Sequence, residues 1–213
     1  MKVSALSNFA MVMIFLLTLF ALQGCKDPET PTQASTESIR PKDNQANTAN
    51  PNRDPLSLPL VNPRIIVFKG ERRLELYSNE RMVRSYRVGL GTNPVGDKVR
   101  QGDRRTPEGE FYVCVKNSRS NYYLSLGLSY PNQEDAERGL RDGLISRDTH
   151  DQIINAIRTR RKPPQNTALG GDIYIHGHGS RDDWTWGCVA LDNSDVRELF
   201  EAVPMGTSVL IKP

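Results

Sequence analysis

The sequence predicts a mainly β domain of the α+β class, built from two sheets with helices at their edge. Short β-forming runs bounded by turn residues fill the first half of the folded part. Two stretches with helical periodicity follow, and then a strand, a helix and a last strand close the chain. Strands first and helices late are typical of an α+β domain.

Five strands are expected in the first half of the folded part. Turn residues such as Asn79-Glu80 and Gly89-Leu90-Gly91 separate runs rich in β-branched and aromatic residues. These runs predict strands over residues 65–68, 74–77, 82–90, 109–115 and 122–128.

Two helices are expected in the middle. Asn132 can cap a short helix that runs to about Leu140. Thr149 with Gln152 has the spacing of a capping box in a second helical stretch, which ends near Arg161.

The last part of the chain is expected to form two strands around a helix. Residues 172–176 and 207–211 are short apolar runs that predict strands. Between them a helix is expected to begin near Ser194 and to end at Pro204. Its apolar residues at helical spacing are Val196, Leu199, Phe200 and Val203.

The first 62 residues are expected to lie outside this domain. Residues 1–24 have a basic start and an apolar run, which indicates a secretory signal peptide. Leu22-Gln23-Gly24-Cys25 resembles the lipobox of bacterial lipoproteins, which predicts cleavage before Cys25 and its lipidation; an ordinary signal peptide or an uncleaved anchor is the alternative. Residues 25–62 are rich in Pro, Thr, Ser, Asn and Gln and predict a disordered tether, which leaves residues 63–213 to fold.

Charge gives no indication of a nucleic-acid partner. The 28 Lys and Arg residues and 25 Asp and Glu residues are spread along the chain, for a net charge of +3. A nucleic-acid-binding surface needs clustered basic residues, so no such partner is expected.

Residues 175–191 contain most of what a thiol enzyme needs. A thiolate is the nucleophile, so Cys188 would need a nearby base or cation to lower its pKa. His176, at the end of an expected strand, can supply that base. Gly187 has no side chain, so backbone N–H groups beside it could approach a developing oxyanion.

Other interpretations of the cysteines and tryptophans are open. Cys188 and Cys114 could form a disulfide in an oxidising compartment. Cys114 also fits a small buried residue on a strand. Trp184 and Trp186 could be core residues or could wall a substrate groove beside the nucleophile.

A metal site is a further alternative for the same stretch. His176, His178 and Cys188 could be zinc ligands, with Asp172 or His150 completing the set. Otherwise His178 has no assigned role and fits a surface histidine.

Two separate blocks resemble the catalytic domain of the L,D-transpeptidase (YkuD-like) family. His176-Gly177 and Thr185-Trp186-Gly187-Cys188 are similar to the family's His-Gly, a spacer, and a Ser or Thr two positions before Gly-Cys. Residues 102–111 are similar to its Gly-Asp…Thr-Pro-Glu-Gly turn, which leads into a strand. The resemblance extends from about residue 64 to 212 and implies two packed mixed β-sheets with helices inserted late in the chain.

The resemblance also implies an activity on peptidoglycan stem peptides. Cys188 would attack the L-centre carbonyl of the third stem residue, expel the terminal D-Ala and hold the acyl group as a thioester. His176 would be the proton donor and acceptor, and backbone donors near Gly187 would hold the oxyanion. The residues expected to bind substrate are Thr185, Trp186, Trp184 and Gly177. No cofactor or metal ion is required.

The acceptor decides the product of this reaction. A second stem's amine would give a cross-link, the lysine of an outer-membrane lipoprotein would give a protein anchor, and water would make the enzyme an L,D-carboxypeptidase. Trp186 and Ala190 stand where the family commonly has His and Arg, and the spacer after His176 is shorter. These departures are similar to a proteobacterial branch that includes both cross-linking enzymes and hydrolases.

The resemblance places the protein in the periplasm on a lipid anchor. Lys26 directly follows the cysteine expected to be lipidated, which by resemblance favours the outer membrane. A peptidoglycan-binding lipoprotein that kept the fold and lost turnover is the alternative from another class.

Overall fold

The structure, a computed structural model, describes residues 55–213. The expected signal peptide, Cys25 and most of the expected tether lie outside the described residues. Residues 55–62, assigned to the end of the tether from the sequence, already contact the domain, because Leu56 and Leu60 pack against the main core. The folded part therefore begins before the expected boundary at residue 63.

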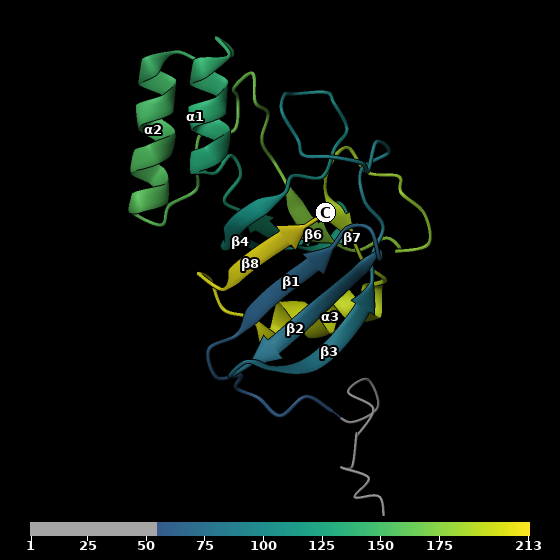
Figure 1. The fold of residues 1–213 in the computed structure, drawn as a ribbon. Helices are drawn as coiled ribbons and strands as arrows, with labels where there is room; N and C mark the ends of the chain where they lie inside the picture. The colour runs from purple at the N-terminus through teal and green to yellow at the C-terminus, as the bar shows by residue number, and fades with distance from the viewer. Residues whose placement is uncertain (1–54) are drawn as a thin grey trace, which may run out of the picture. The chain divides into compact units, whose positions relative to one another are not determined.

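Eight strands and three helices form the described part (Figure 1). The strands are β1 (Arg64–Phe68), β2 (Arg73–Ser78), β3 (Arg81–Arg87), β4 (Gly109–Ser120), β5 (Tyr123–Leu128), β6 (Tyr174–His176), β7 (Val189–Ala190) and β8 (Ser208–Lys212). The helices are α1 (Gln133–Arg141), α2 (Arg147–Arg158) and α3 (Asn193–Ala202). The mainly β class with late helices is confirmed, and β7 is the strand that the sequence did not indicate.

Strand β4 joins the two halves of the sheet. The order is β3-β2-β1-β8-β4-β5-β6-β7. The start of β4 pairs with β8, and from Val113 onward it pairs with β5. The pairs β1–β8 and β6–β7 are parallel, so both halves are mixed. The two expected sheets are thus continuous through β4.

One main core lies between the two halves. It contains Ile65 and Leu76 from the first half and Leu126 and Ile175 from the second. Helix α3 covers this core with Val196, Leu199 and Ala202. Helices α1 and α2 lie side by side away from it and enclose a smaller core (Figure 1).

The helix caps follow the sequence only in part. Asn132 caps α1 in a capping box with Asp135, as expected for its N-cap. The expected capping box of Thr149 with Gln152 is wrong: Ser146 caps α2 and its Oγ accepts the Thr149 N–H at 3.2 Å. Helix α3 begins after Asp192, two residues before the expected cap. No helix within residues 55–213 has the length and apolar character needed to cross a bilayer.

Candidate active site

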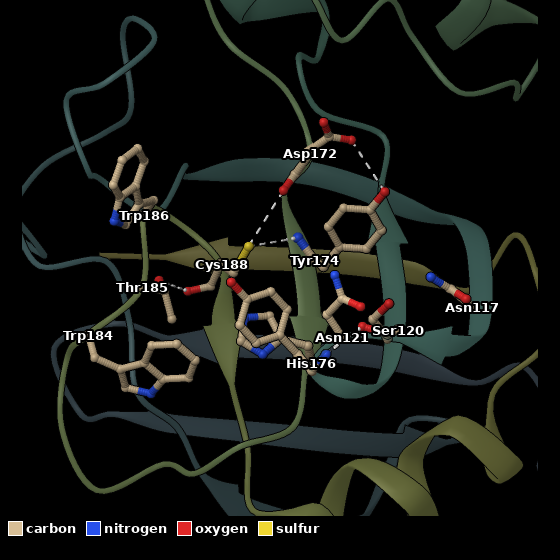
Figure 2. A pocket seen from close by; sticks show the side chains of 12 residues that line it. Asn117, Ser120, Asn121, Asp172, Tyr174, His176, Trp184, Thr185, Trp186 and Cys188 are labelled. Carbon is tan, nitrogen blue, oxygen red and sulfur yellow. Dashed lines mark hydrogen bonds between the residues drawn. The ribbon is translucent and has the colours of Figure 1, made fainter.

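Strands β6 and β7 bring the expected histidine and cysteine to one cavity. The two strands pair in parallel, with His176 opposite Ala190. Cys188 lies two residues before Ala190, so its side chain and that of His176 point to the same face of the sheet. Both residues line a cavity of about 640 Å³ (Figure 2).

The His176 imidazole is buried and held in one tautomer. Its Nδ1 lies 2.8 Å from the Gly177 carbonyl oxygen, which can only accept, so Nδ1 carries the proton and Nε2 is free to accept one. Burial lowers the pKa of His176 below its ordinary value, His178 acts in the same direction, and the bond to Gly177 opposes both. At neutral pH the ring is therefore neutral and suited to act as a base.

Backbone groups of Tyr174, the first residue of β6, and of Asp172 hold the Cys188 thiol (Figure 2). The Tyr174 N–H donates to Sγ at 3.4 Å, and Sγ donates to the Asp172 carbonyl at 3.5 Å. Within residues 55–213 Sγ makes no hydrogen bond with His176. Burial raises the pKa of Cys188 to about 11, the Tyr174 N–H opposes this rise, and the charge of Asp172 adds to it. The expected lowering of this pKa is therefore wrong for the resting protein.

Thr185 shapes the loop that carries Cys188. Its buried Oγ1 accepts the Gly187 N–H at 3.1 Å and donates to the Cys188 carbonyl at 2.8 Å. Gly187 has a φ of +127°, and a Cβ there would lie 2.6 Å from the Arg105 carbonyl oxygen. No other residue fits this position without displacing the backbone.

Backbone donors for the oxyanion were expected near Gly187, and the Gly187 N–H itself is already occupied. This N–H is bonded to Thr185, so it cannot also serve a developing oxyanion. The Cys188 N–H has no hydrogen-bond acceptor among residues 55–213. That N–H lies next to Sγ and is available to donate a hydrogen bond to an oxyanion.

The two tryptophans are wall residues and not core residues. Trp184 lines the cavity and meets His176 edge-on, with ring centroids 5.5 Å apart. Trp186 also lines it, is 74% exposed, and has the Arg104 guanidinium 5.2 Å above its ring.

Gly177 has a supporting position and does not line this cavity. Its N–H donates to the Tyr122 carbonyl at 3.0 Å, and its own carbonyl holds His176. The expectation that Gly177 contacts substrate is therefore replaced by a role in orienting the imidazole.

The disulfide and metal interpretations find no support in the geometry. Cys114 is buried on β4, and Cys114 and Cys188 are both free thiols. His178 is exposed. Across residues 55–213 no three or more His, Cys, Asp or Glu side chains gather in a way that could hold a metal ion.

The β4–β5 hairpin supplies site residues that sequence reasoning missed. Its contributions to the cavity wall are Asn117, Ser120, Asn121, Tyr122 and Ser125. Polar residues beside a tyrosine at a predicted strand end were visible in the sequence. No local sequence pattern, however, predicts that these residues lie beside a histidine on another strand.

A second cavity meets the first at Cys188. It has a volume of about 230 Å³, and Asp172, Trp186 and Cys188 line both cavities. Its remaining wall includes Lys98 and the amides of Gln165 and Asn166. Cys188 is therefore approachable from two sides.

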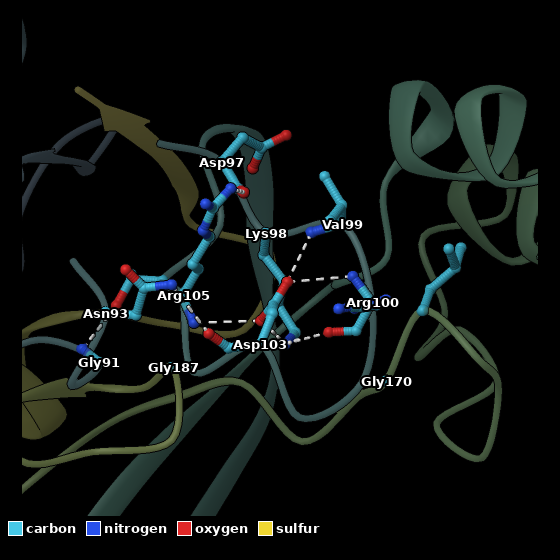
Figure 3. Close-up of polar contacts among 12 residues, drawn as sticks. Gly91, Asn93, Asp97, Lys98, Val99, Arg100, Asp103, Arg105, Gly170 and Gly187 are labelled. Carbon is cyan, nitrogen blue, oxygen red and sulfur yellow. Dashed lines mark hydrogen bonds and ion pairs between the residues drawn. The ribbon is translucent and has the colours of Figure 1, made fainter. Parts of the chain in front are cut away.

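The second sequence block forms a loop that is centred on a buried carboxylate (Figure 3). Asp103 accepts hydrogen bonds from the Lys98 ammonium at 2.8 Å and from the backbone N–H groups of Val99, Arg100 and Arg105. Burial alone would raise the pKa of Asp103, but these bonds hold it below its ordinary value. The loop sets the Arg105 carbonyl against Gly187, so it supports the loop that carries Cys188.

The range matched by a known protein family includes both blocks. Residues 62–211 match the YkuD family, described as the L,D-transpeptidase catalytic domain. The chain is 28% identical over 146 residues to "Putative L,D-transpeptidase YafK" of Escherichia coli strain K12, covering 65% of this chain and 46% of that protein. It is 25% identical over 149 residues to "Putative L,D-transpeptidase YqjB" of Bacillus subtilis, covering 70% of each. The chain thus spans about half the length of YafK.

Solved structures show the same fold. The helical cell shape determining protein Pgp2 of Campylobacter jejuni, as its K307A mutant, has a TM-score of 0.51 and 24% identity. That match covers 70% of this chain and 46% of the other. With the family match over residues 62–211, these findings show that the chain belongs to the L,D-transpeptidase catalytic domain (YkuD) family.

Proposed function

We propose that this protein is a peptidoglycan L,D-transpeptidase with Cys188 as nucleophile and His176 as its base. The observation that carries the proposal is a neutral imidazole with a free Nε2 in the same cavity as the thiol. Both residues sit in the sequence block that the family shares. The substrates would be peptidoglycan stem peptides, and the reaction needs no cofactor.

The first half-reaction forms a thioester. When a stem binds, Nε2 of His176 takes the proton from Sγ as the sulfur attacks the L-centre carbonyl of the third stem residue. The Cys188 N–H donates to the oxyanion. The imidazolium then gives its proton to the amine of the leaving D-Ala, and the acyl group stays on the sulfur.

The second half-reaction moves the acyl group to an acceptor. An amine attacks the thioester, His176 removes the amine proton, and the departing sulfur is reprotonated. The two cavities that meet at Cys188 support transfer, because an acyl donor and an acceptor amine need separate approaches to one carbonyl carbon. The acceptor would be a second stem or an outer-membrane lipoprotein lysine, and water in its place would make the same site a carboxypeptidase.

The resting thiol adds a feature to this mechanism. With its pKa raised to about 11, Cys188 is protonated until substrate arrives. Substrate binding must therefore close the contact between Sγ and Nε2, since catalytic hydrogen bonds are often formed only in the complex.

The proposed location is the periplasm, on a lipid anchor at Cys25 in the outer membrane. The residue pattern at 22–25 and Lys26 support this part of the proposal.

Acylation measured by intact mass tests the function. The wild type and Cys114→Ala should both gain the mass of the stem acyl group from a tetrapeptide or of a carbapenem-type probe, whereas Cys188→Ala should gain neither. Products from digested sacculi then separate cross-links from tripeptides. A wild type that binds stems without acylation would identify a non-catalytic binding protein and contradict the proposal.

A further inference from the structure

We propose that Tyr122 is the positioning residue for the His176 base, an inference that rests on the proposed function and deepens it. Tyr122 lies at the turn of the β4–β5 hairpin. Its ring stacks on the imidazole with centroids 4.7 Å apart and planes inclined by 30°. Trp184 meets the same imidazole with its edge, so the two aromatic rings restrict how the histidine can rotate.

The same residue also fixes the backbone that sets the histidine tautomer. The Tyr122 carbonyl accepts the Gly177 N–H at 3.0 Å, and the Gly177 carbonyl lies 2.8 Å from His176 Nδ1. One residue therefore controls both the plane of the ring and the acceptor that keeps the proton on Nδ1. Nε2 therefore stays unprotonated and can accept the thiol proton.

Strand pairing explains why a hairpin turn reaches the histidine. Strand β5 pairs antiparallel with β6, with Ser125 opposite His176, so the turn that precedes β5 lies just beyond the histidine. The turn itself is fixed locally. The Ser120 hydroxyl accepts the Tyr122 N–H at 3.1 Å, and Tyr123 has a left-handed φ of +71°.

Core packing does not account for Tyr122. Its side chain is 47% exposed, and its ring contacts are with His176, His178 and Trp184. Among residues 55–213 its hydroxyl has no hydrogen-bond partner. A large aromatic residue that is half exposed and touches mainly site residues is better explained by the site than by stability.

Loss of the ring should change how His176 titrates. The other titratable groups around the imidazole are His178 and, in the same cavity, the Cys188 thiol, the Asp172 carboxylate and the Tyr122 and Tyr174 hydroxyls. The Tyr122 ring covers a ring that is itself 3% exposed. Without that cover water reaches the imidazole, and the pKa of His176 should rise towards its ordinary value.

The test compares Tyr122→Leu with Tyr122→Phe, using Tyr77→Leu on β2 as the control for loss of a tyrosine elsewhere. The measurement is the acylation rate of Cys188 by a stem tetrapeptide across pH. Tyr122→Phe should stay within about twofold of the wild type because the ring remains. Tyr122→Leu should be about tenfold to a hundredfold slower, with the acid limb of its profile moved to higher pH. Tyr77→Leu should match the wild type.

Equal rates and equal pH profiles for the wild type and Tyr122→Leu would overturn the proposal. So would an equal defect in Tyr122→Phe, because that result would assign the role to the hydroxyl. If Tyr122→Leu does not fold, the imidazole protons of His176 in the wild type decide by NMR. Stacking requires ring-current shifts of these protons and a titration midpoint below the ordinary value, and their absence would refute it. The NMR measurement tests the role of Tyr122 even if the wild type shows no acylation. Absence of acylation would contradict the proposed function and not the position of the imidazole.

Discussion

The Cys188 thiol and the His176 imidazole share one cavity, but each hydrogen-bonds to backbone groups and not to the other. The thiol bonds to the backbone at Tyr174 and Asp172, and burial raises its pKa to about 11. The imidazole is neutral and has its acceptor nitrogen free. Such a pair differs from a preformed thiolate and imidazolium. Because the rate of cysteine oxidation depends on the fraction of thiolate, a protonated thiol is protected from indiscriminate oxidation.

Replacement of the two histidines should separate the base from its neighbour. His176→Ala removes the proton acceptor, so the acylation rate should fall by about a hundredfold to ten-thousandfold. His178→Ala should have a much smaller effect, because the His178 side chain is exposed and its ring contact is with Tyr122 and not with Cys188. Rates are measured with a stem tetrapeptide, before and after exhaustive chelation with metal content recorded. A loss of activity on chelation would contradict the thiol mechanism and support a metal site.

The nucleophile loop, residues 185–188, is named for the proposed role of Cys188, and its shape depends on one hydroxyl. Thr185 Oγ1 bonds to both the Gly187 N–H and the Cys188 carbonyl, and the Arg105 carbonyl closes the loop from the other side. The loop therefore presents Sγ and the Cys188 N–H in one fixed relation.

Thr185→Val should distort this loop at nearly constant volume. The buried Gly187 N–H would lose its acceptor, which costs about 1–3 kcal/mol in the free energy of unfolding. Thr185→Ser keeps the hydroxyl and is the matched control, with stability within about 1 kcal/mol of the wild type. Urea denaturation measures stability, and the acylation rate should fall in the valine variant alone. Equal stability of the two variants would show that the hydroxyl does not hold the loop.

The loop around Asp103 supports the nucleophile loop from behind, and its ion pair is buried. Lys98 and Asp103 have side chains only 4% and 7% exposed. Asp103→Asn leaves the Lys98 charge without its partner and should cost about 3–5 kcal/mol. Glu71→Gln, which breaks the exposed pair with Arg73, should cost at most about 1 kcal/mol. Chemical denaturation of both variants gives the comparison, and similar losses would contradict it.

The same carboxylate predicts a pH dependence of stability. Its pKa in the folded protein lies below the value of 3.8 for an unperturbed Asp. The stability it contributes is therefore fully present above about pH 4 and is lost as the pH falls through the folded-state pKa. This part of the acid destabilisation should be missing in Asp103→Asn.

At the scale of the whole molecule, the site depends on strands from both halves of the sheet. The main cavity is walled by β4, β5 and β6 together with the loop before β7. The bridge between Gly89 and Ala190 brings the chain after β3 to β7. The first half thus supports the nucleophile through Gly89, Gly91 and the Asp103 loop, although it contributes no residue to the main cavity.

Cys25→Ser tests the proposed anchor of the whole protein. Without a lipidated cysteine the protein should become soluble in the periplasm or stay unprocessed, whereas the wild type should fractionate with membranes. Fractionation and N-terminal mass measure both outcomes. An unchanged membrane fraction with a cleaved N-terminus would count against lipidation at this residue.

The sequence by itself determined the mainly β class and nearly all of the strands and helices, and it indicated Cys188 and His176 as the candidate pair. Strand and helix periodicity, turn residues and the Asn132 cap are local properties, so a single chain reveals them. The proposed catalytic residues could also be picked out locally, because each lies in a short block that resembles the family's motif, within the matched residues 62–211. The predicted start of the domain at residue 63 was too late, because Leu56 and Leu60 pack on the core despite their polar surroundings in sequence. The predicted cap of α2 was wrong, because Ser146 offers a competing cap.

Only the tertiary structure decided how the site works. Two features join residues that are distant in sequence: the stack of Tyr122 on His176 and the second cavity beside Cys188. A third, the hydrogen bond from the Gly187 N–H to Thr185, depends on the exact path of the backbone. The direction of the Cys188 pKa shift was also set by burial, which outweighs the opposing effects of the Tyr174 N–H and the Lys98 charge. Burial and long-range contact are properties of the folded chain, so no local pattern contains them.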